Sequence, residues 1–312
     1  MGVTLDDVRF LVEARAAGVD FARTLTIGRQ QFYLSPDDLD EASRLFPDPA
    51  AARAVLAGEA GSTTGGGGPV TYADGLFALL GAAQVDSLDL SDFEGATLLH
   101  DLNQPVPPQL HGRYDLVYDG GSLEHVFAFP TAIRSCMEMV KVDGHLLVQS
   151  PTNNWCGHGF YQFSPELYFR VLAPENGFVV EQMVAVELDG RGRWFSVKDP
   201  AGVGRRVELR NHTPTNLMVR ARRVDGVTPF ASTPQQSDYA RAWDRSPAPA
   251  PPPAPTATAP LTRLVRAGGR VRSEVRAWLA GQGRSRPLTL SDRRFYTPVG
   301  GGARRRPRAR RR

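Results

Sequence analysis

Short apolar runs alternate with amphipathic segments along the chain. From Leu5 to Ala17 the apolar residues recur at three- and four-residue steps, which is the period of a helix. The segment 21–27 is instead a short apolar run that ends at Gly28, as expected of a buried strand. The same contrast predicts further helices at 36–46, 72–80, 130–140 and 164–172, and strands at 85–88, 97–99, 114–118 and 146–149. Two of these helices begin with Ser-Pro, which suits an N-cap and a first turn.

Three later segments, 178–186, 205–209 and 216–221, are rich in β-forming residues and are expected to close the sheet as strands. The run Gly65–Gly68 lies in a segment that we expect to be a loop. Strands and helices therefore follow one another in αβ order. This order predicts an α/β fold with a Rossmann-like, doubly wound sheet of about seven strands.

Acidic residues and glycines follow several of the predicted strands. Asp89 comes after the strand at 85–88, Asp101 after the strand at 97–99, and Asp119–Gly121 after the strand at 114–118. In a parallel sheet the carboxyl ends of the strands meet at one edge, and α/β proteins bind their ligands there. Each acid alone could simply form a turn, but three strand-end acids in this register favour a ligand site.

Two segments in this region carry a family resemblance. The run Asp115-Leu-Val-Tyr-Asp-Gly-Gly-Ser-Leu-Glu-His-Val126, with Val142-Asp-Gly-His-Leu-Leu-Val148 after it, resembles strands four and five of the class I S-adenosylmethionine-dependent methyltransferases. The resemblance extends over about Thr24 to Arg223. It implies that the last strands of the sheet form an antiparallel hairpin, and that S-adenosylmethionine is the cofactor.

The resemblance also implies a role for each strand end. Asp89 would accept hydrogen bonds from the ribose hydroxyls, and Asp101 with Leu102 would hold the adenine. The residues after the strand at 114–118 would border the methionine end of the cofactor. The predicted cofactor-binding residues are thus Gly28, Asp89, Asp101, Leu102, Asp119, Gly120 and Gly121.

The chain departs from this family at the end of the first strand. Family members carry a glycine-rich loop of the type E/D-x-G-x-G-x-G there, whereas this chain has Gly28-Arg-Gln-Gln31. The glycines at 65–68 do not replace that loop, because they have the character of a linker. The cofactor pocket is therefore expected to be either modified or lost.

Two histidines are candidates for catalysis. His125 lies shortly after the strand at 114–118, where it could take a proton from an acceptor hydroxyl, although it could equally cap a helix or pack against it. His158 lies between two glycines in a loop, 153–165, that is rich in amides and aromatic residues. Such a loop suits a small-molecule or glycan acceptor, as in relatives with a similar Gly-His-Gly, but it could also be a buried aromatic cluster.

Charge divides the chain into unlike parts. Residues 261–312 hold sixteen arginines against two acids, a net charge of +14, so residues 1–260 carry −10 of the total of +4. We predict a methyltransferase-like domain at 1–230, a proline-rich linker at 231–260, and a disordered basic tail at 261–312 in which an amphipathic helix could form. The tail could bind an anionic partner, either a membrane surface or nucleic acid, but a GC-rich genome could also account for its arginines.

The rest of the composition narrows the class of protein. Cys136 and Cys156 form neither a disulfide framework nor a metal-ligand cluster, so no metal is expected. Neither a signal peptide nor a membrane-spanning apolar run is evident, and a cytoplasmic location is expected.

Three functions remain open on these observations. The first is methyl transfer from S-adenosylmethionine to a small-molecule or glycan-type acceptor. The second is a non-catalytic relative, a binding or scaffold protein that has lost the cofactor loop. A dinucleotide-binding or nucleotide-sugar-binding protein is disfavoured, because no G-x-G-x-x-G follows any predicted strand.

Overall fold

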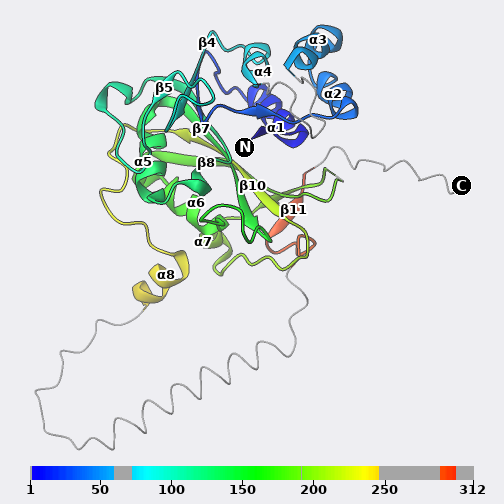
Figure 1. Cartoon of the computed structure of the whole chain (residues 1–312). Coiled ribbons are helices and arrows are strands. Elements are labelled where there is room, and N and C mark those ends of the chain that lie inside the picture. The colour runs from blue at the N-terminus through cyan, green and yellow to red at the C-terminus, as the bar shows by residue number, and fades with distance from the viewer. Residues whose placement is uncertain (1, 60–71, 191, 246–288, 300–312) are drawn as a thin grey trace, which may run out of the picture.

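The computed structural model describes residues 2–59, 72–190, 192–245 and 289–299. A nine-stranded sheet forms its centre (Figure 1). Its strands are β2 (Arg23–Ile27), β4 (Gln84–Asp89), β5 (Leu98–Leu99), β6 (Tyr114–Gly120), β7 (Val140–Asn153), β8 (Phe178–Glu187), β9 (Trp194–Val197), β10 (Thr215–Arg223) and β11 (Tyr296–Pro298). A separate two-stranded sheet pairs β1 (Gly2–Val3) with β3 (Gln31–Phe32).

The helices of the described residues are mostly short. They are α1 (Leu5–Ala16), α2 (Pro36–Ser43), α3 (Pro49–Glu59), α4 (Asp74–Leu79), α5 (Phe129–Met139), α6 (Pro165–Val171), α7 (Pro200–Val203) and α8 (Ser237–Arg245), with 3-10 turns η1 (Pro108–Leu110), η2 (Leu123–His125) and η3 (Pro174–Asn176). Within the described ranges, no helix is long and apolar enough to cross a membrane.

The order of the strands is that of a doubly wound fold. The sheet runs β11-β9-β8-β10-β7-β6-β2-β4-β5. From β5 to β7 all neighbours are parallel, and the chain order reverses between β2 and β6. β10 lies antiparallel between β7 and β8. The predicted fold class and the antiparallel closing strands are confirmed, whereas the predicted number of about seven strands is wrong.

Helices cover both faces of the sheet, and alternation along the strands supplies a core to each. Val117 and Leu146 pack with α5 and α6, whereas Leu116, Tyr118 and Leu147 pack with α1 to α4. Figure 1 shows α1 to α4, in blue and cyan, together on one side. Both faces of the sheet are therefore packed against a hydrophobic core, which holds the carboxyl ends of the strands in fixed positions.

Local hydrogen bonds explain where several helices begin. Ser35 and Ser164 are N-caps, and their hydroxyls accept from the backbone N–H of Asp38 and Leu167. At the start of α1 the carboxylate of Asp7 accepts from the backbone N–H of Thr4 and from the hydroxyl of buried Tyr118. Burial nevertheless raises the pKa of Asp7 to about 6, because desolvation outweighs these hydrogen bonds.

Some predicted elements differ from the structure. Residues 205–209 form no strand, although Val207 and Leu209 do pack against the core, so their alternation reported burial but not pairing. The strand β9 at Trp194–Val197 takes the place beside β8 instead. The helix α3 was not predicted, since its alanine-rich sequence carries little helical period.

The C-terminal region contributes more to the body than its composition indicates. β11 pairs with β9, and Phe295 and Tyr296 are buried in the core. Further upstream, α8 attaches to α6 through the hydrogen bond from Ser237 N–H to the carboxylate of Glu166. Within the segment predicted as a tail, Tyr296–Pro298 thus form a strand of the sheet, and Leu290 and Phe295 pack in the core. The rest of the predicted tail, its amphipathic helix, the proline-rich part of the linker and the Gly65–Gly68 loop lie outside the described residues.

Candidate functional site

A cleft of about 200 Å³ opens at the carboxyl ends of β2 and β4 and beside the turn after β6. It brings together five of the predicted site residues, namely Gly28, Asp89, Asp101, Leu102 and His125. Ser122, Asn103 and Val126 complete much of its wall, and none of them was predicted. The cleft lies beside the point where the strand order reverses, which is where doubly wound sheets bind ligands.

The floor of the cleft requires a glycine at position 28. Gly28 has φ of +70°, a backbone conformation that residues with a Cβ rarely adopt. A Cβ there would lie 3.0 Å from the hydroxyl oxygen of Ser122, which donates to the carbonyl of Ile27. A side chain at this position would therefore be strained and would also narrow the cleft.

The two strand-end acids hold their carboxylates differently. Asp89 accepts from the backbone N–H of Leu90 through Oδ1, and its Oδ2 lies 3.8 Å from the Cβ position of Gly28. Asp101 accepts from the backbone and side chain of Asn103, and these hydrogen bonds lower the pKa of Asp101. In the described ranges, the second oxygen of each acid has no hydrogen-bond partner.

Asp119, Gly120 and Gly121, which were predicted to bind the cofactor, do not line the cleft. Asp119 is fully buried, and its Oδ1 caps the turn by accepting from the backbone N–H groups of Ser122 and Leu123. Gly121, at φ of +96°, makes the bend that carries the chain into η2. Burial, and then the charge of Glu124, raises the pKa of Asp119 well above its ordinary value.

Gln30 fills the space beside Gly120. Its Nε2 donates to the carbonyls of Ile27 and Gly28, and its side chain is almost fully buried. A Cβ on Gly120 would overlap Oε1 of Gln30, which has no hydrogen-bond partner in the described part of the chain. The space between the ends of β2 and β6 is thus occupied by a side chain. In the sequence, the only indication of this filled space was that no second glycine follows Gly28.

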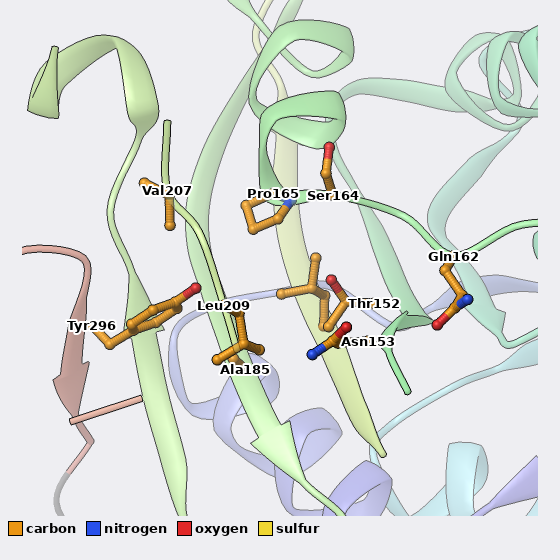
Figure 2. A pocket seen from close by; sticks show the side chains of 10 residues that line it. Thr152, Asn153, Gln162, Ser164, Pro165, Ala185, Val207, Leu209 and Tyr296 are labelled. Carbon is orange, nitrogen blue, oxygen red and sulfur yellow. The ribbon is translucent and has the colours of Figure 1, made fainter. Parts of the chain in front are cut away.

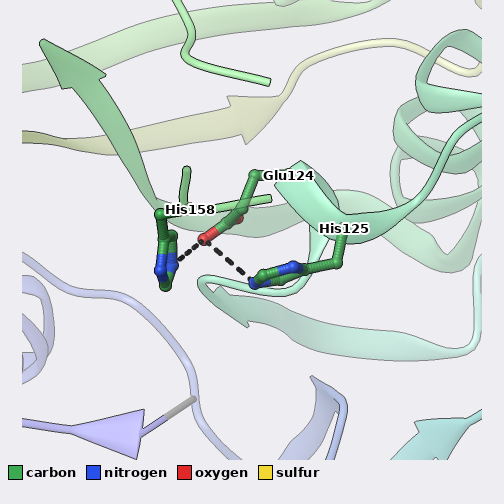
Figure 3. A group of neighbouring side chains, drawn as sticks. All are labelled: Glu124, His125 and His158. Atoms are coloured by element: carbon green, nitrogen blue, oxygen red, sulfur yellow. Dashed lines mark ion pairs between the residues drawn. The ribbon is translucent and has the colours of Figure 1, made fainter. Parts of the chain in front are cut away.

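Glu124, His125 and His158 form a compact group next to the cleft (Figure 3). Oε1 of Glu124 lies 3.6 Å from Nε2 of His158 and 4.0 Å from Nε2 of His125. The two imidazole rings meet edge to face at 5.1 Å between centroids. Burial raises the pKa of Glu124 to about 7, whereas burial and the charge of His158 lower the pKa of His125. The structure therefore unites the two histidines that the sequence singled out separately.

The loop after β7 is fastened onto this group. Phe160 N–H donates to the carbonyl of Glu124, and the Tyr161 hydroxyl donates to the carbonyl of Phe127. At Gly159, with φ of +73°, a Cβ would lie 2.8 Å from the carbonyl oxygen of Glu124. The rings of Phe127 and Phe160 meet at 5.8 Å and are largely exposed. Phe127 and Phe160 thus form an exposed apolar surface in the segments that carry the two histidines.

A second pocket, of about 170 Å³, lies at the end of β7 (Figure 2). Thr152, Asn153 and Gln162 form one wall, with Ser164 and Pro165 at the start of α6. Tyr296 of β11 closes the opposite side, so the C-terminal segment contributes to this pocket. Gln162 also accepts from the backbone N–H of Trp155, which connects the pocket to the loop that carries His158.

No protein-family model and no curated protein matches this sequence. Among solved structures, the chain is similar to a protein of Bacillus halodurans to which methyltransferase activity is attributed, with 12% identity over 70% of this chain and 99% of the other, at a TM-score of 0.38. The 1,6-didemethyltoxoflavin N1-methyltransferase of Burkholderia thailandensis, solved with S-adenosylhomocysteine, shares 12% identity over 70% and 78% of the two chains, at 0.37.

A third similar structure is SpnF, described as a cyclase, with 15% identity over 71% of this chain and 81% of the other, at a TM-score of 0.38. The group thus contains proteins described by different activities. At this level of similarity, none of them assigns a ligand or a reaction to this chain.

Proposed function

We propose that the cleft binds the nucleoside part of S-adenosylmethionine, and that the protein transfers the methyl group to a small-molecule or glycan-type acceptor. The observation that carries the proposal is Asp89, whose Oδ2 faces the bare backbone of Gly28 at a strand end. A carboxylate in this position can accept from both ribose hydroxyls. Asp101 and Leu102 then border the base.

When bound, the sulfonium centre of the cofactor supplies a methyl group that is already activated. The work of the protein is therefore to hold donor and acceptor close and aligned. His125 lines the cleft, and burial lowers its pKa, which favours the neutral imidazole that can accept a proton from an acceptor hydroxyl. The exposed rings of Phe127 and Phe160 offer an apolar surface to the acceptor.

Calorimetry on the full chain tests the proposal. We expect S-adenosylmethionine and S-adenosylhomocysteine each to bind once per chain, with adenosine binding more weakly to the same cleft. Absence of any binding at millimolar concentration would remove the proposal and leave the scaffold function.

A non-catalytic, nucleoside-binding protein is a second candidate, and Gln30 favours it. Asp89, Asp101 and Leu102 support binding of the nucleoside half of the cofactor. The buried Gln30 side chain, however, lies between the ends of β2 and β6, where we expect the methionyl half to extend. If Gln30 cannot move, ligands that end at the ribose would bind best. Adenosine binding as tightly as S-adenosylmethionine, with no methyl transfer, would favour this candidate.

A separate proposal concerns the arginine-rich sequence near the C-terminus. The run Arg304-Arg-Arg-Pro-Arg-Ala-Arg-Arg-Arg312 would bind polyanions without sequence preference, because its charge displaces their counterions.

A further inference from the structure

We propose that Glu124, His125 and His158 form a binding site for a divalent first-row transition metal ion, with Zn²⁺ as the best-suited ion. The site would hold the ion whether or not the protein transfers methyl groups. The geometry of the three side chains, the burial of Glu124 and the loop that holds His158 in place all favour it.

The donor atoms are almost at coordination geometry. One ligand atom from each residue lies within 4.8 Å of the others. Donors around a tetrahedral zinc ion lie about 3.3 Å apart, given metal–ligand bonds of roughly 2.0–2.2 Å. Oε1 of Glu124 lies 3.6 and 4.0 Å from the two Nε2 atoms, and small rotations of the two half-exposed imidazoles would shorten these distances to that value. Both Nε2 atoms already point at the same carboxylate oxygen (Figure 3).

A hydrogen-bonded cluster explains these positions less well. Neither imidazole is within hydrogen-bonding distance of Glu124, although the carboxylate is only 2% exposed. Its Oε2 has no hydrogen-bond partner among the described residues, and buried carboxylates are normally paired or bound to metals. Within these residues Glu124 forms ion pairs with the two histidines alone. A bound cation would satisfy this carboxylate.

The third ligand is held in place by the loop 154–161. His158 N–H donates to the carbonyl of Trp155, and the Trp155 ring lies 4.9 Å from the imidazole. The close approach of Gly159 to the carbonyl of Glu124 keeps the loop against η2. These contacts hold His158 beside Glu124, which is distant in the sequence. Metal ligands need such support from surrounding residues to keep their orientation.

The chemistry of the donors selects the class of ion. Two imidazole nitrogens and one carboxylate oxygen suit Zn²⁺ and its neighbours in the first transition row, whereas Mg²⁺ and Ca²⁺ prefer oxygen donors throughout. Three protein ligands leave a coordination position free, as in catalytic zinc sites. His125 also lines the cleft, so that position is reachable by a ligand there. A bound ion would lower the pKa of an acceptor hydroxyl, whose proton would then pass to water and not to the His125 imidazole.

Metal titration of the full chain, without a histidine tag and after treatment with a chelator, tests this site. In competition with a chromophoric chelator we expect one Zn²⁺ per chain, and at least about 100-fold weaker binding in His125→Ala and in His158→Ala. His111→Ala is the matched control, since His111 also lies 3.6 Å from a glutamate, Glu138, but without a second histidine. Zn²⁺ binding that is equally tight in all four proteins would overturn the site.

Two further measurements separate a metal site from a structural cluster. Co²⁺ should give the visible absorption of a low-coordinate site in the wild type and not in His158→Ala. Zn²⁺ should raise the melting temperature of the wild type but not that of Glu124→Gln, a variant of nearly the same size. Binding of Mg²⁺ instead of Zn²⁺, with the same dependence on the three residues, would contradict the assigned class of ion.

Discussion

Gln30 and Gly120 are in direct contact, and the Gln30 side chain leaves no room for a Cβ on Gly120. Replacing Gly120 by alanine would force a Cβ into the buried amide of Gln30, so we expect Gly120→Ala to lower the free energy of unfolding by about 1–3 kcal/mol. Chemical denaturation measures the change. Combining it with Gln30→Ala should recover most of the loss, because the smaller side chain frees the space.

The control for this change is Gly58→Ala in α3, where a Cβ would meet nothing within 4 Å. This substitution should be neutral or stabilising, since alanine favours the helix. If Gly120→Ala leaves the free energy of unfolding as little changed as Gly58→Ala does, Gln30 does not pack closely on Gly120.

Gln30 also allows a test of which ligand the cleft accepts. Gln30→Gly should strengthen binding of S-adenosylmethionine by about tenfold or more, while leaving the affinity for adenosine nearly unchanged, because only the longer ligand extends past Gly28. Calorimetry with both ligands gives the two affinities. A parallel loss of both affinities would show instead that Gln30 supports the shape of the whole cleft.

Asp89 should dominate binding of the ribose. Asp89→Ala removes a charged acceptor worth about 1.5–3 kcal/mol, so we expect affinity for S-adenosylhomocysteine to fall roughly 10- to 100-fold. Asp92→Ala is the matched control, since Asp92 is an exposed acid three residues further on. Equal effects of the two changes on the dissociation constant would contradict the assigned strand end.

Asp7 should make stability depend on pH between about 4 and 6. Burial raises the pKa of Asp7 to about 6, above the value of about 3.9 in an unfolded chain, so the folded state binds the proton more tightly. Stability from this group is present below pH 4 and is lost as pH rises towards 6, by roughly 3 kcal/mol. Unfolding of wild type and Asp7→Asn across this range should reveal the difference.

The corresponding control is Asp37→Asn, which changes an exposed acid in the first turn of α2. Its stability should follow that of the wild type at every pH. If Asp7→Asn also follows the wild type, Asp7 is solvated or better paired than the structure indicates.

The segment 289–299 should contribute to the stability of the folded protein. A chain ending at residue 288 should melt at a clearly lower temperature than one ending at residue 299, because only the longer one keeps buried Phe295 and Tyr296. Phe295→Ala alone should cost about 3–5 kcal/mol, with exposed Thr297→Ala as control. Equal melting temperatures of the two shortened chains would show that β11 contributes no stability.

Comparison of the full chain with the chain ending at 299 tests the arginine-rich sequence. The full chain should bind heparin or anionic vesicles more tightly at low salt, and this difference should disappear as salt rises. A difference that persists at high salt would point to specific contacts instead.

Much of the fold was predictable because local pattern and tertiary burial agree. The strand at 114–118 is apolar except for Asp115, and the structure buries it on both faces as β6. The N-caps at Ser35 and Ser164 were predictable because capping depends on neighbours within three residues. Residues 205–209 show the limit, since alternation reports burial of Val207 and Leu209 and not a pairing partner.

The candidate site was predictable only in part, since its residues come from separate segments. Asp89 and His125 were found because strand ends share one edge of a parallel sheet. The group of Glu124, His125 and His158 was not predicted as a unit, because it depends on the path of the loop after β7. Gln30 was visible only as a missing glycine, and the space that it fills follows from tertiary packing.

The pairing of β11 with β9 has a consequence for the biosynthesis of the protein. Val197 and Tyr296 are neighbours in the sheet, but the ribosome adds the second about a hundred residues after the first. Until then the nascent chain exposes the outer edge of β9, with free backbone donors and acceptors that could pair with another chain. Closing so long a loop is also slow compared with local pairing. A pause in translation before residue 289 would therefore prolong the period in which the protein is most prone to aggregation.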